Sequence, residues 1–151
     1  MRAIGDAVRE WQRATDAVDQ AVCDRFGVNR TDGRCLDIVL QYGGVTAGEL
    51  AERSGMSPAA ITTVIDRLER GGWVDRARDE HDRRRVVVRA TEKSERAAEE
   101  IFGEIARDAM RAFERYSDHD LNVLYDWLRH AERHQMQFAA WIRGEGDRPR
   151  M

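Results

Sequence analysis

The fold of this chain is decided by residues 46–91, which read TAGELAERSGMSPAAITTVIDRLERGGWVDRARDEHDRRRVVVRAT. This stretch predicts two short helices joined by a tight turn, followed by a hairpin with an arginine-rich tip. Thr46 and Glu49 are spaced as a helix N-cap and its reciprocal partner. Gly55 supplies the turn, because glycine adopts a positive φ without steric cost. The order of elements is that of a helix-turn-helix with a wing.

The second helix of this pair is predicted to begin at Ser57 and Pro58, a side-chain cap followed by proline at the first helical position. Its apolar residues recur at helical spacing and predict one buried face, made of Ile61, Val64, Ile65 and Leu68. The residues outside this face are small and polar near the helix start, so the helix can lie close to base edges. We therefore predict that the major-groove contacts are Ser57, Ala59, Ala60, Thr62, Thr63 and Arg67. The alternative is a solvated face, because this geometry also occurs in packing units that never touch DNA.

The predicted hairpin has extended runs at residues 73–77 and 85–90, and the triplet of valines at 86–88 favours a strand. Residues 76–89 hold six arginines against three acidic residues, a formal charge of +3 in a chain whose net charge is −3. Positive charge is therefore concentrated where the hairpin tip would project. An arginine there can enter a narrow minor groove, while its neighbours neutralise phosphates. The alternative is a solvated charged turn.

The segments SPAAITTVIDRLERGGWV and DRRRVVVRAT resemble the winged helix-turn-helix of the MarR family of bacterial transcription regulators. The resemblance implies a wing at Asp82, Arg83, Arg84 and Arg85. It implies that Asp82 braces the wing or pairs with nearby arginines, and that Arg84 enters the minor groove. The rest of the chain fits the family as well, since long helices flank this segment.

The sequence departs from the family pattern at three positions. Thr62 matches a usual recognition-helix threonine, but Thr63 stands where many members carry arginine. This departure predicts a different base readout. Ala90 replaces a usual leucine and Ser94 a usual glycine, and both are mild changes.

Long amphipathic helices at both ends of the chain predict a dimer. Near-heptad apolar spacing marks the first helix, a second helix is predicted to open at Thr31, and the last two helices carry similar stripes. A chain of 151 residues cannot bury every stripe alone, so the ends are expected to interdigitate in a homodimer. Two recognition helices would then face a pseudopalindromic operator in double-stranded DNA, with half-sites one helical turn apart.

The expected architecture is mainly α with a small β-wing, in a single domain over residues 1–144. It combines a winged helix-turn-helix lobe with a dimerisation lobe from the N- and C-terminal helices. The expected parts are the dimerisation helices at residues 1–30 and 92–143, the winged helix-turn-helix at residues 31–91, and a flexible tail at residues 145–151.

Composition and motifs exclude several classes of protein. No apolar stretch is long enough to span a bilayer, and the start MRAIGDAVREW has no signal-peptide core, so we expect a cytoplasmic protein without a membrane partner. There is no glycine-rich phosphate loop, nucleophile elbow or paired metal-ligand motif. We therefore expect no enzymatic activity and no cofactor.

Two pairs of reactive side chains have simpler interpretations. Cys23 and Cys35 are expected to be ordinary, partly buried thiols, although a peroxide-sensing thiol, as some MarR-family members carry, is the alternative. His130 and His134 lie four apart and could ligate zinc, but a solvated pair on the last helix is the preferred interpretation. We therefore predict no metal site.

The family resemblance also implies a small lipophilic or aromatic effector that changes the spacing of the recognition helices. Trp11, Tyr42 and Trp73 could line its pocket, but ordinary core positions are preferred, and we assign no residues to an effector pocket. The favoured hypothesis is a homodimeric, sequence-specific transcriptional repressor released by a small ligand. The alternatives are a winged-helix protein-interaction module and a thiol-based redox regulator on the same scaffold.

Overall fold

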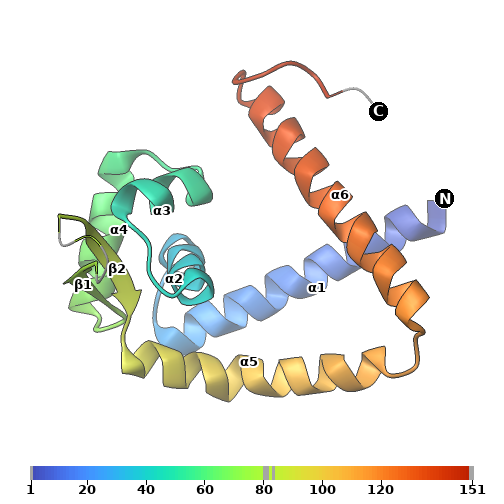
Figure 1. Ribbon diagram of the computed structural model, residues 1–151, viewed down its shortest axis with the longest axis horizontal. Coiled ribbons are helices and arrows are strands. Elements are labelled where there is room, and N and C mark those ends of the chain that lie inside the picture. Colours follow the sequence, from blue (N-terminus) through green and yellow to red (C-terminus); the bar gives the residue numbers. More distant parts are fainter. Residues whose placement is uncertain (1, 80–81, 83, 150–151) are drawn as a thin grey trace. The chain divides into compact units, whose positions relative to one another are not determined.

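A computed structural model describes every residue except 1, 80–81, 83 and 150–151. The described residues form six helices and one antiparallel two-stranded sheet, as predicted (Figure 1). In chain order these elements are α1 (Arg2–Phe26), α2 (Arg30–Tyr42), α3 (Ala47–Ser54), α4 (Pro58–Arg70), β1 (Val74–Arg78), β2 (Val86–Ala90), α5 (Glu92–Phe113) and α6 (Asp118–Ile142). The chain divides within α5 into two compact units, residues 1–103 and 104–151.

The helix-turn-helix begins and ends at the predicted residues. Thr46 accepts a hydrogen bond from Glu49 N, and the Glu49 carboxylate accepts one from Thr46 N at 2.7 Å, which completes the capping box of α3. Gly55 ends α3 with φ 70°, a left-handed conformation that glycine adopts at no steric cost. Ser57 then caps α4 by accepting from Ala60 N at 3.3 Å.

Other boundaries differ from the predictions. The cap of α2 is Asn29, not Thr31, because the Asn29 backbone is extended and its side-chain oxygen accepts from Asp32 N at 2.9 Å. The first strand begins one residue late, at Val74. Trp73 turns into the core instead, where its ring stacks on Phe26 with centroids 4.8 Å apart.

The core of the first unit lies between α2, α3, α4 and the hairpin. The predicted apolar face of α4 is confirmed as buried, with Ile61, Val64, Ile65 and Leu68 each at most 1% exposed. Val45 pairs with Val88 through two backbone hydrogen bonds of 2.7 and 3.0 Å, so the loop before α3 is joined to the hairpin. The wing is therefore fixed to the helix-turn-helix by backbone as well as by side chains.

The join between the wing and α5 explains why serine is tolerated at position 94. Thr91 caps α5, since its Oγ1 accepts from Ser94 N at 3.3 Å. Ser94 is fully buried, and its hydroxyl donates to the carbonyl oxygen of Trp73. The extra polar group is thus satisfied inside the core.

Helix α6 starts with a second capping box, formed by Ser117 and Asp120. The structure finds none of its residues buried, although it carries many apolar side chains. None of the described helices combines the length and apolar character that crossing a membrane requires.

Candidate nucleic-acid interface

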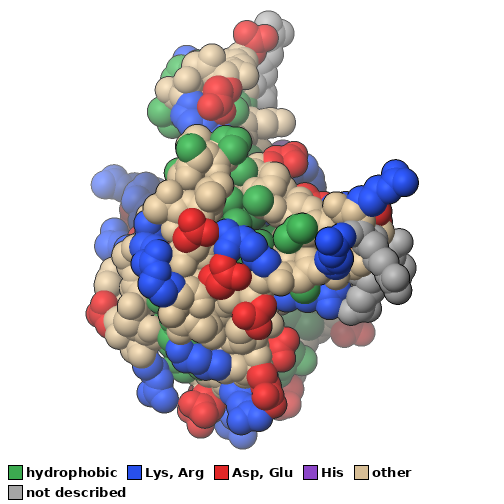
Figure 2. Space-filling view, turned by 90° about the vertical axis from the view of Figure 1, so that its left-hand side faces the viewer, with side chains coloured by type: hydrophobic (Ala, Val, Ile, Leu, Met, Phe, Trp, Pro, Cys, Tyr) green, Lys and Arg blue, Asp and Glu red, His purple; other side chains and the backbone are tan. Residues whose placement is uncertain are grey.

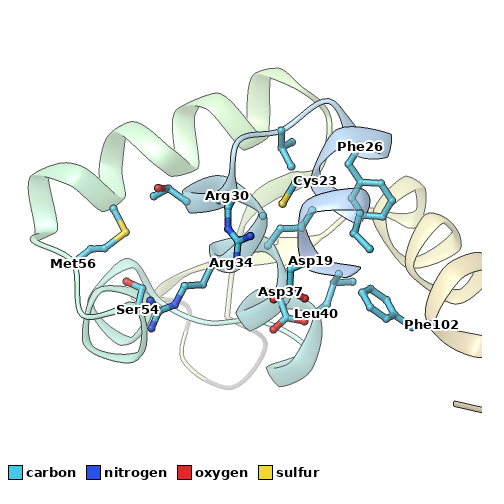
Figure 3. Close-up of a pocket in the computed structure, with 15 residues that line it drawn as sticks. Asp19, Cys23, Phe26, Arg30, Arg34, Asp37, Leu40, Ser54, Met56 and Phe102 are labelled. Carbon is cyan, nitrogen blue, oxygen red and sulfur yellow. The ribbon is translucent and has the colours of Figure 1, made fainter. Parts of the chain in front are cut away.

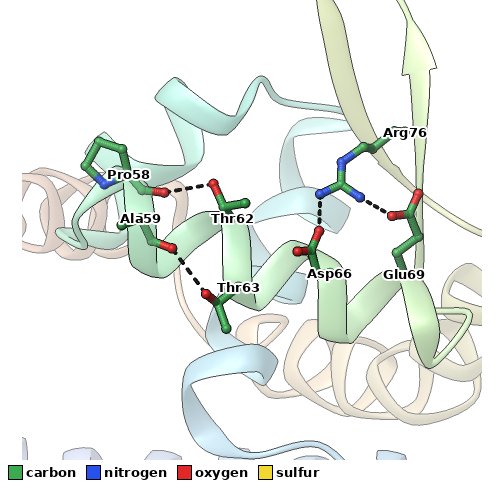
Figure 4. A network of polar contacts seen from close by, with 7 residues as sticks. All are labelled: Pro58, Ala59, Thr62, Thr63, Asp66, Glu69 and Arg76. Atoms are coloured by element: carbon green, nitrogen blue, oxygen red, sulfur yellow. Dashed lines mark hydrogen bonds and ion pairs between the residues drawn. The ribbon is translucent and has the colours of Figure 1, made fainter.

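The outer face of α4 is an uncharged, small-residue surface near its N-terminus. Ser57, Ala59, Thr62 and Thr63 are exposed and Ala60 is half-buried. The Thr62 hydroxyl donates to Pro58 O at 3.1 Å and the Thr63 hydroxyl to Ala59 O at 3.3 Å (Figure 4). Each threonine thus uses its own hydroxyl proton inside the helix and has a methyl group and an oxygen lone pair left to offer a partner.

Arg67, which was predicted with this face, is bound to the protein itself. Its Nε donates to Asp32 Oδ2 at 2.9 Å and its Nη2 donates to Asp32 Oδ1. Asp32 is only 4% exposed, so the pair joins α4 to α2 at the edge of the core. Hydrogen bonding to Asp32 raises the pKa of Arg67. Sequence reasoning missed Asp32, because nothing local connects residues 35 positions apart.

A second arginine connects the wing to the recognition helix. Arg76 on β1 donates hydrogen bonds to Asp66 and Glu69, both on α4 (Figure 4). These bonds raise the pKa of Arg76, with Asp66 as the largest cause. The two carboxylates lie one helical turn apart, which the sequence shows. The sequence does not show that Arg76 is the arginine that binds them. We call Arg76, Asp66 and Glu69 the wing clasp.

The hairpin places the wing arginines at its tip. Strand β1 pairs with β2 in register from Val74 opposite Ala90 to Arg78 opposite Val86. Asp82 closes the turn, since its Oδ1 accepts from Arg84 N at 3.0 Å and its carbonyl accepts from Arg85 N at 2.9 Å. Predicted wing residue 83, an arginine, lies outside the described residues.

The two described tip arginines have different surroundings. The Arg84 side chain is exposed and makes no hydrogen bond or ion pair with any residue that the structure describes. Arg85 donates to Glu49 at 2.9 Å, which ties the wing to the cap of α3. The pKa of Glu49 is lowered mainly by its hydrogen bonds from Thr46, with a smaller contribution from Arg85. Arg84 is therefore the free cation among the described tip residues.

The surface around these elements carries both signs of charge. Figure 2 looks onto the side of the molecule that bears α3, α4 and the hairpin, and shows acidic and basic side chains interspersed over it. Such a surface has no single strong positive field, so the positions of individual uncommitted cations matter more than net charge.

A pocket of about 470 Å³ lies beside the helix-turn-helix, entirely within the first unit (Figure 3). Its apolar lining is Val22, Cys23, Phe26, Val28, Leu36, Leu40, Met56 and Phe102, and its charged lining is Asp19, Arg30, Arg34 and Asp37. Asp37 is exposed at the rim of the pocket, where partial desolvation by its neighbours and, to a smaller extent, the charge of Asp19 raise its pKa. Met56 directly precedes the cap of α4, so the pocket wall adjoins the start of the recognition helix.

The aromatic residues considered for a pocket lie elsewhere. Trp73 is a core residue, Trp11 is 60% exposed, and Tyr42 is 49% exposed with the Arg53 guanidinium 3.8 Å from its ring centroid. None of the three lines the pocket. Residues 30–37 contribute several lining side chains, but RTDGRCLD contains no local motif that predicts a pocket.

The two cysteines are buried thiols, and two histidines of α6 lie against each other. Cys23 and Cys35 are buried free thiols, and burial raises the pKa of each, which disfavours the reactive thiolate. His130 and His134 stack with ring centroids 6.0 Å apart on α6. No group of three metal-binding side chains occurs among the residues that the structure describes.

Comparison with known proteins agrees with this geometry. A family model described as "MarR family" matches residues 28–86. An uncharacterized HTH-type transcriptional regulator of Bacillus subtilis (strain 168), YcgE, is 32% identical over 109 residues, covering 72% of this chain and 71% of YcgE. The HTH-type transcriptional repressor MdtR of the same strain is 31% identical over 79 residues, covering 52% of this chain and 51% of MdtR. The structure of a MarR family protein from Bacillus stearothermophilus matches with a TM-score of 0.64 and 27% identity, covering 88% of this chain and 93% of that one.

Proposed function

Because this chain belongs to the MarR family of DNA-binding transcriptional regulators, we propose that it is a homodimeric repressor whose affinity for its operator is controlled by a small ligand. The observation that carries the proposal is the joint presentation of the small-residue face of α4 and the free Arg84 at the tip of a wing clasped to that helix. One element fits a major groove and the other a flanking minor groove. Repression is supported by the similarity to MdtR, which is named a repressor.

The DNA contacts fall into two classes in this proposal. Ser57, Ala59, Ala60, Thr62 and Thr63 meet base edges and phosphates from α4. Arg84 enters the minor groove, where a narrow, strongly negative A·T tract attracts a guanidinium.

Arg67 supports the interface from behind and does not touch bases, since two of its donors are bound to Asp32. Asp82 keeps the wing tip closed through its hydrogen bonds to the backbone of Arg84 and Arg85. Arg85 uses only its Nη2 on Glu49 and is 48% exposed, so its other donors are left for a phosphate beside the wing.

The homodimer is supported by apolar surface that the single chain leaves in water. The exposed large apolar side chains of α1, α5 and α6 are Ile4, Trp11, Val18, Phe102, Ile105, Met110, Phe113, Val123, Leu124, Tyr125, Trp127, Leu128, Met136, Trp141 and Ile142. A soluble monomer rarely exposes so much apolar surface, and a symmetric partner would bury it. Two recognition helices related by a two-fold axis would then bind a pseudopalindromic operator.

Control by a ligand is supported by the pocket next to α4. Its volume of about 470 Å³ suits a small molecule, and its wall of apolar side chains with a few charged groups suits an amphipathic or aromatic one. A ligand that contacts Met56 would bear on the residue before the α4 cap. It would change DNA affinity if it bound one orientation of α4 more tightly than another.

The test is a mobility-shift titration of the full-length protein on a fragment that spans the upstream region of its own gene, across a salt series. We expect selective binding that weakens steeply as salt rises, because phosphate contacts release counterions. A scrambled fragment of the same composition is the control. Equal binding to both fragments by ligand-stripped protein would overturn the proposal.

A further inference from the structure

The base-reading surface of α4 has an unusual composition for a recognition helix. Residues 57–66 contain no arginine, lysine, asparagine or glutamine. Guanine is read most often by arginine or lysine donating to its O6 and N7 acceptors, and adenine by asparagine or glutamine. The N-terminal half of α4, which is the part that reaches base edges in helix-turn-helix proteins, therefore has no bidentate reader.

The arginines next to this surface cannot substitute for one. Arg67 is held on buried Asp32, and Arg76 is held on Asp66 and Glu69 in the wing clasp. The clasp also occupies the Asp66 carboxylate, which could otherwise accept from cytosine. Arg70 lies about 18 Å along the helix axis from the first turn, too far to share its base pairs.

The hydrogen bonds of the threonine hydroxyls also disfavour reading of guanine by this surface. Because Thr62 and Thr63 already donate to Pro58 O and Ala59 O, each can offer a base a methyl group and an acceptor lone pair. An A·T pair matches both features, with the thymine C5 methyl and the adenine N6 amino group. In a G·C pair guanine presents only acceptors and cytosine offers its N4 amino donor but no methyl group, so the methyl contact is what distinguishes A·T from G·C. Ser57 accepts from Ala60 N, so its hydroxyl proton is left to donate to a DNA phosphate at the start of α4.

We infer that α4 selects operator half-sites by packing Ala59, Thr62 and Thr63 against thymine methyl groups of A·T pairs, and not by donating to guanine. This inference rests on the proposed function and names the class of DNA sequence that it requires. The wing adds a second preference for A·T, in the minor groove. Base readout by α4 is therefore mainly apolar, while the wing senses the minor groove by charge.

The experiment starts from the full chain and a random duplex library, from which bound sequences are selected and amplified. We then replace single thymines of the enriched half-site by uracil, which removes only the major-groove methyl. Replacing one contacted thymine by uracil should weaken binding about fourfold, because the complex loses the burial of one methyl group. Uracil placed outside the half-site is the control and should change nothing.

Matched variants separate the methyl from the hydroxyl. Thr63→Ser removes the methyl group, so this variant should bind the thymine duplex more weakly than the wild type does. It should also bind the thymine and uracil duplexes with equal affinity. Thr63→Val keeps the methyl and should bind within about twofold of the wild type. The same pair applies at Thr62, and both sites are exposed, so circular dichroism should show unchanged folding.

The inference is overturned if enriched half-sites contain guanines whose N7 methylation blocks binding, or if uracil duplexes bind as tightly as thymine duplexes. These results leave the proposed function intact, because selective binding has been observed. Failure to enrich any sequence overturns the proposed function, and the inference with it.

Discussion

Arg67 on α4 and Asp32 on α2 form a bidentate ion pair, with Nε 2.9 Å from Oδ2 and Nη2 donating to Oδ1. The Asp32 side chain is 6% exposed and that of Arg67 is 38% exposed. The carboxylate is therefore shielded from solvent, while the guanidinium is still partly solvated. Removing the arginine would leave a buried charge without its partner, which is more costly than the pair is favourable.

We expect Arg67→Met to lower the free energy of unfolding by about 2–3 kcal/mol, because a buried carboxylate loses two charged hydrogen bonds. Urea denaturation at a fixed protein concentration measures this, since the stability of a dimer depends on concentration. Arg70→Met, on the same helix but exposed, should change stability by less than about 0.5 kcal/mol. Asp32→Asn should recover part of the loss in the Arg67→Met background. Equal effects of the two arginine variants would contradict this account.

The wing clasp makes a prediction about DNA affinity. Arg76→Gln should weaken operator binding about fivefold near physiological salt, because the Asp66 and Glu69 carboxylates would repel the phosphates. Adding Asp66→Asn should restore much of the affinity, and raising the salt should narrow the gap between the variants. Fluorescence anisotropy on one operator duplex gives all three affinities. If the double variant bound DNA no better than Arg76→Gln, Arg76 would not act by neutralising the Asp66 and Glu69 carboxylates.

How much of this arrangement could be predicted depends on the sequence distance of each contact. The caps at Thr46 and Ser57 and the buried face of α4 depend on residues one helical turn apart, so the sequence specifies them directly. Arg85 bonds to Glu49 across 36 positions, a contact that only the folded hairpin creates. The same is true of Arg67, which periodicity assigned to the outer face but which a buried carboxylate turns inward.

Competition between local signals explains the smaller errors. The sequence predicts Thr31 as the cap, but the extended backbone is at Asn29, whose side-chain oxygen accepts from Asp32 N, so Asn29 caps α2. The sequence predicts that Trp73 begins the first strand. Its carbonyl accepts from Thr91 N at 3.2 Å across the hairpin, but its side chain turns inward and stacks on Phe26, and the strand begins at Val74. A local cap hydrogen bond therefore decides where α2 begins, and packing against Phe26 decides the orientation of Trp73.

Glu49 predicts a pH dependence. Its pKa is lowered below its ordinary value of 4.5, mainly by hydrogen bonds from Thr46, so its stabilising effect is present above the unfolded-state pKa. The effect is lost as pH falls through the lower, folded-state pKa. The melting temperature of the wild type should therefore exceed that of Glu49→Gln at neutral pH, and the two should converge in acid. Thermal melts from neutral pH down to below pH 4.5 check this, and a gap that widened in acid would contradict it.

Arg84 is expected to read groove shape and not only charge. Arg84→Ala should reduce affinity about tenfold for operators with A·T-rich flanks and about threefold for G·C-rich flanks, because narrow minor grooves concentrate negative potential. Arg70→Ala is the control and should affect both duplexes alike. Anisotropy titrations on two duplexes that differ only in their flanks measure the ratio. Equal loss from Arg84→Ala on both would reduce its role to a phosphate contact.

The thiols provide the last prediction. Burial raises the pKa of both Cys23 and Cys35, so few thiolates exist near neutral pH and oxidation should be slow. We expect iodoacetamide to label both cysteines slowly in the native protein and rapidly in urea. DNA binding by the Cys23→Ser/Cys35→Ser variant should match that of the wild type before and after peroxide. If peroxide released the wild type from DNA but spared the double variant, a thiol switch on this scaffold would replace the ligand-controlled repressor.

Because Cys23 lines the pocket, its labelling rate also reports on any ligand bound there.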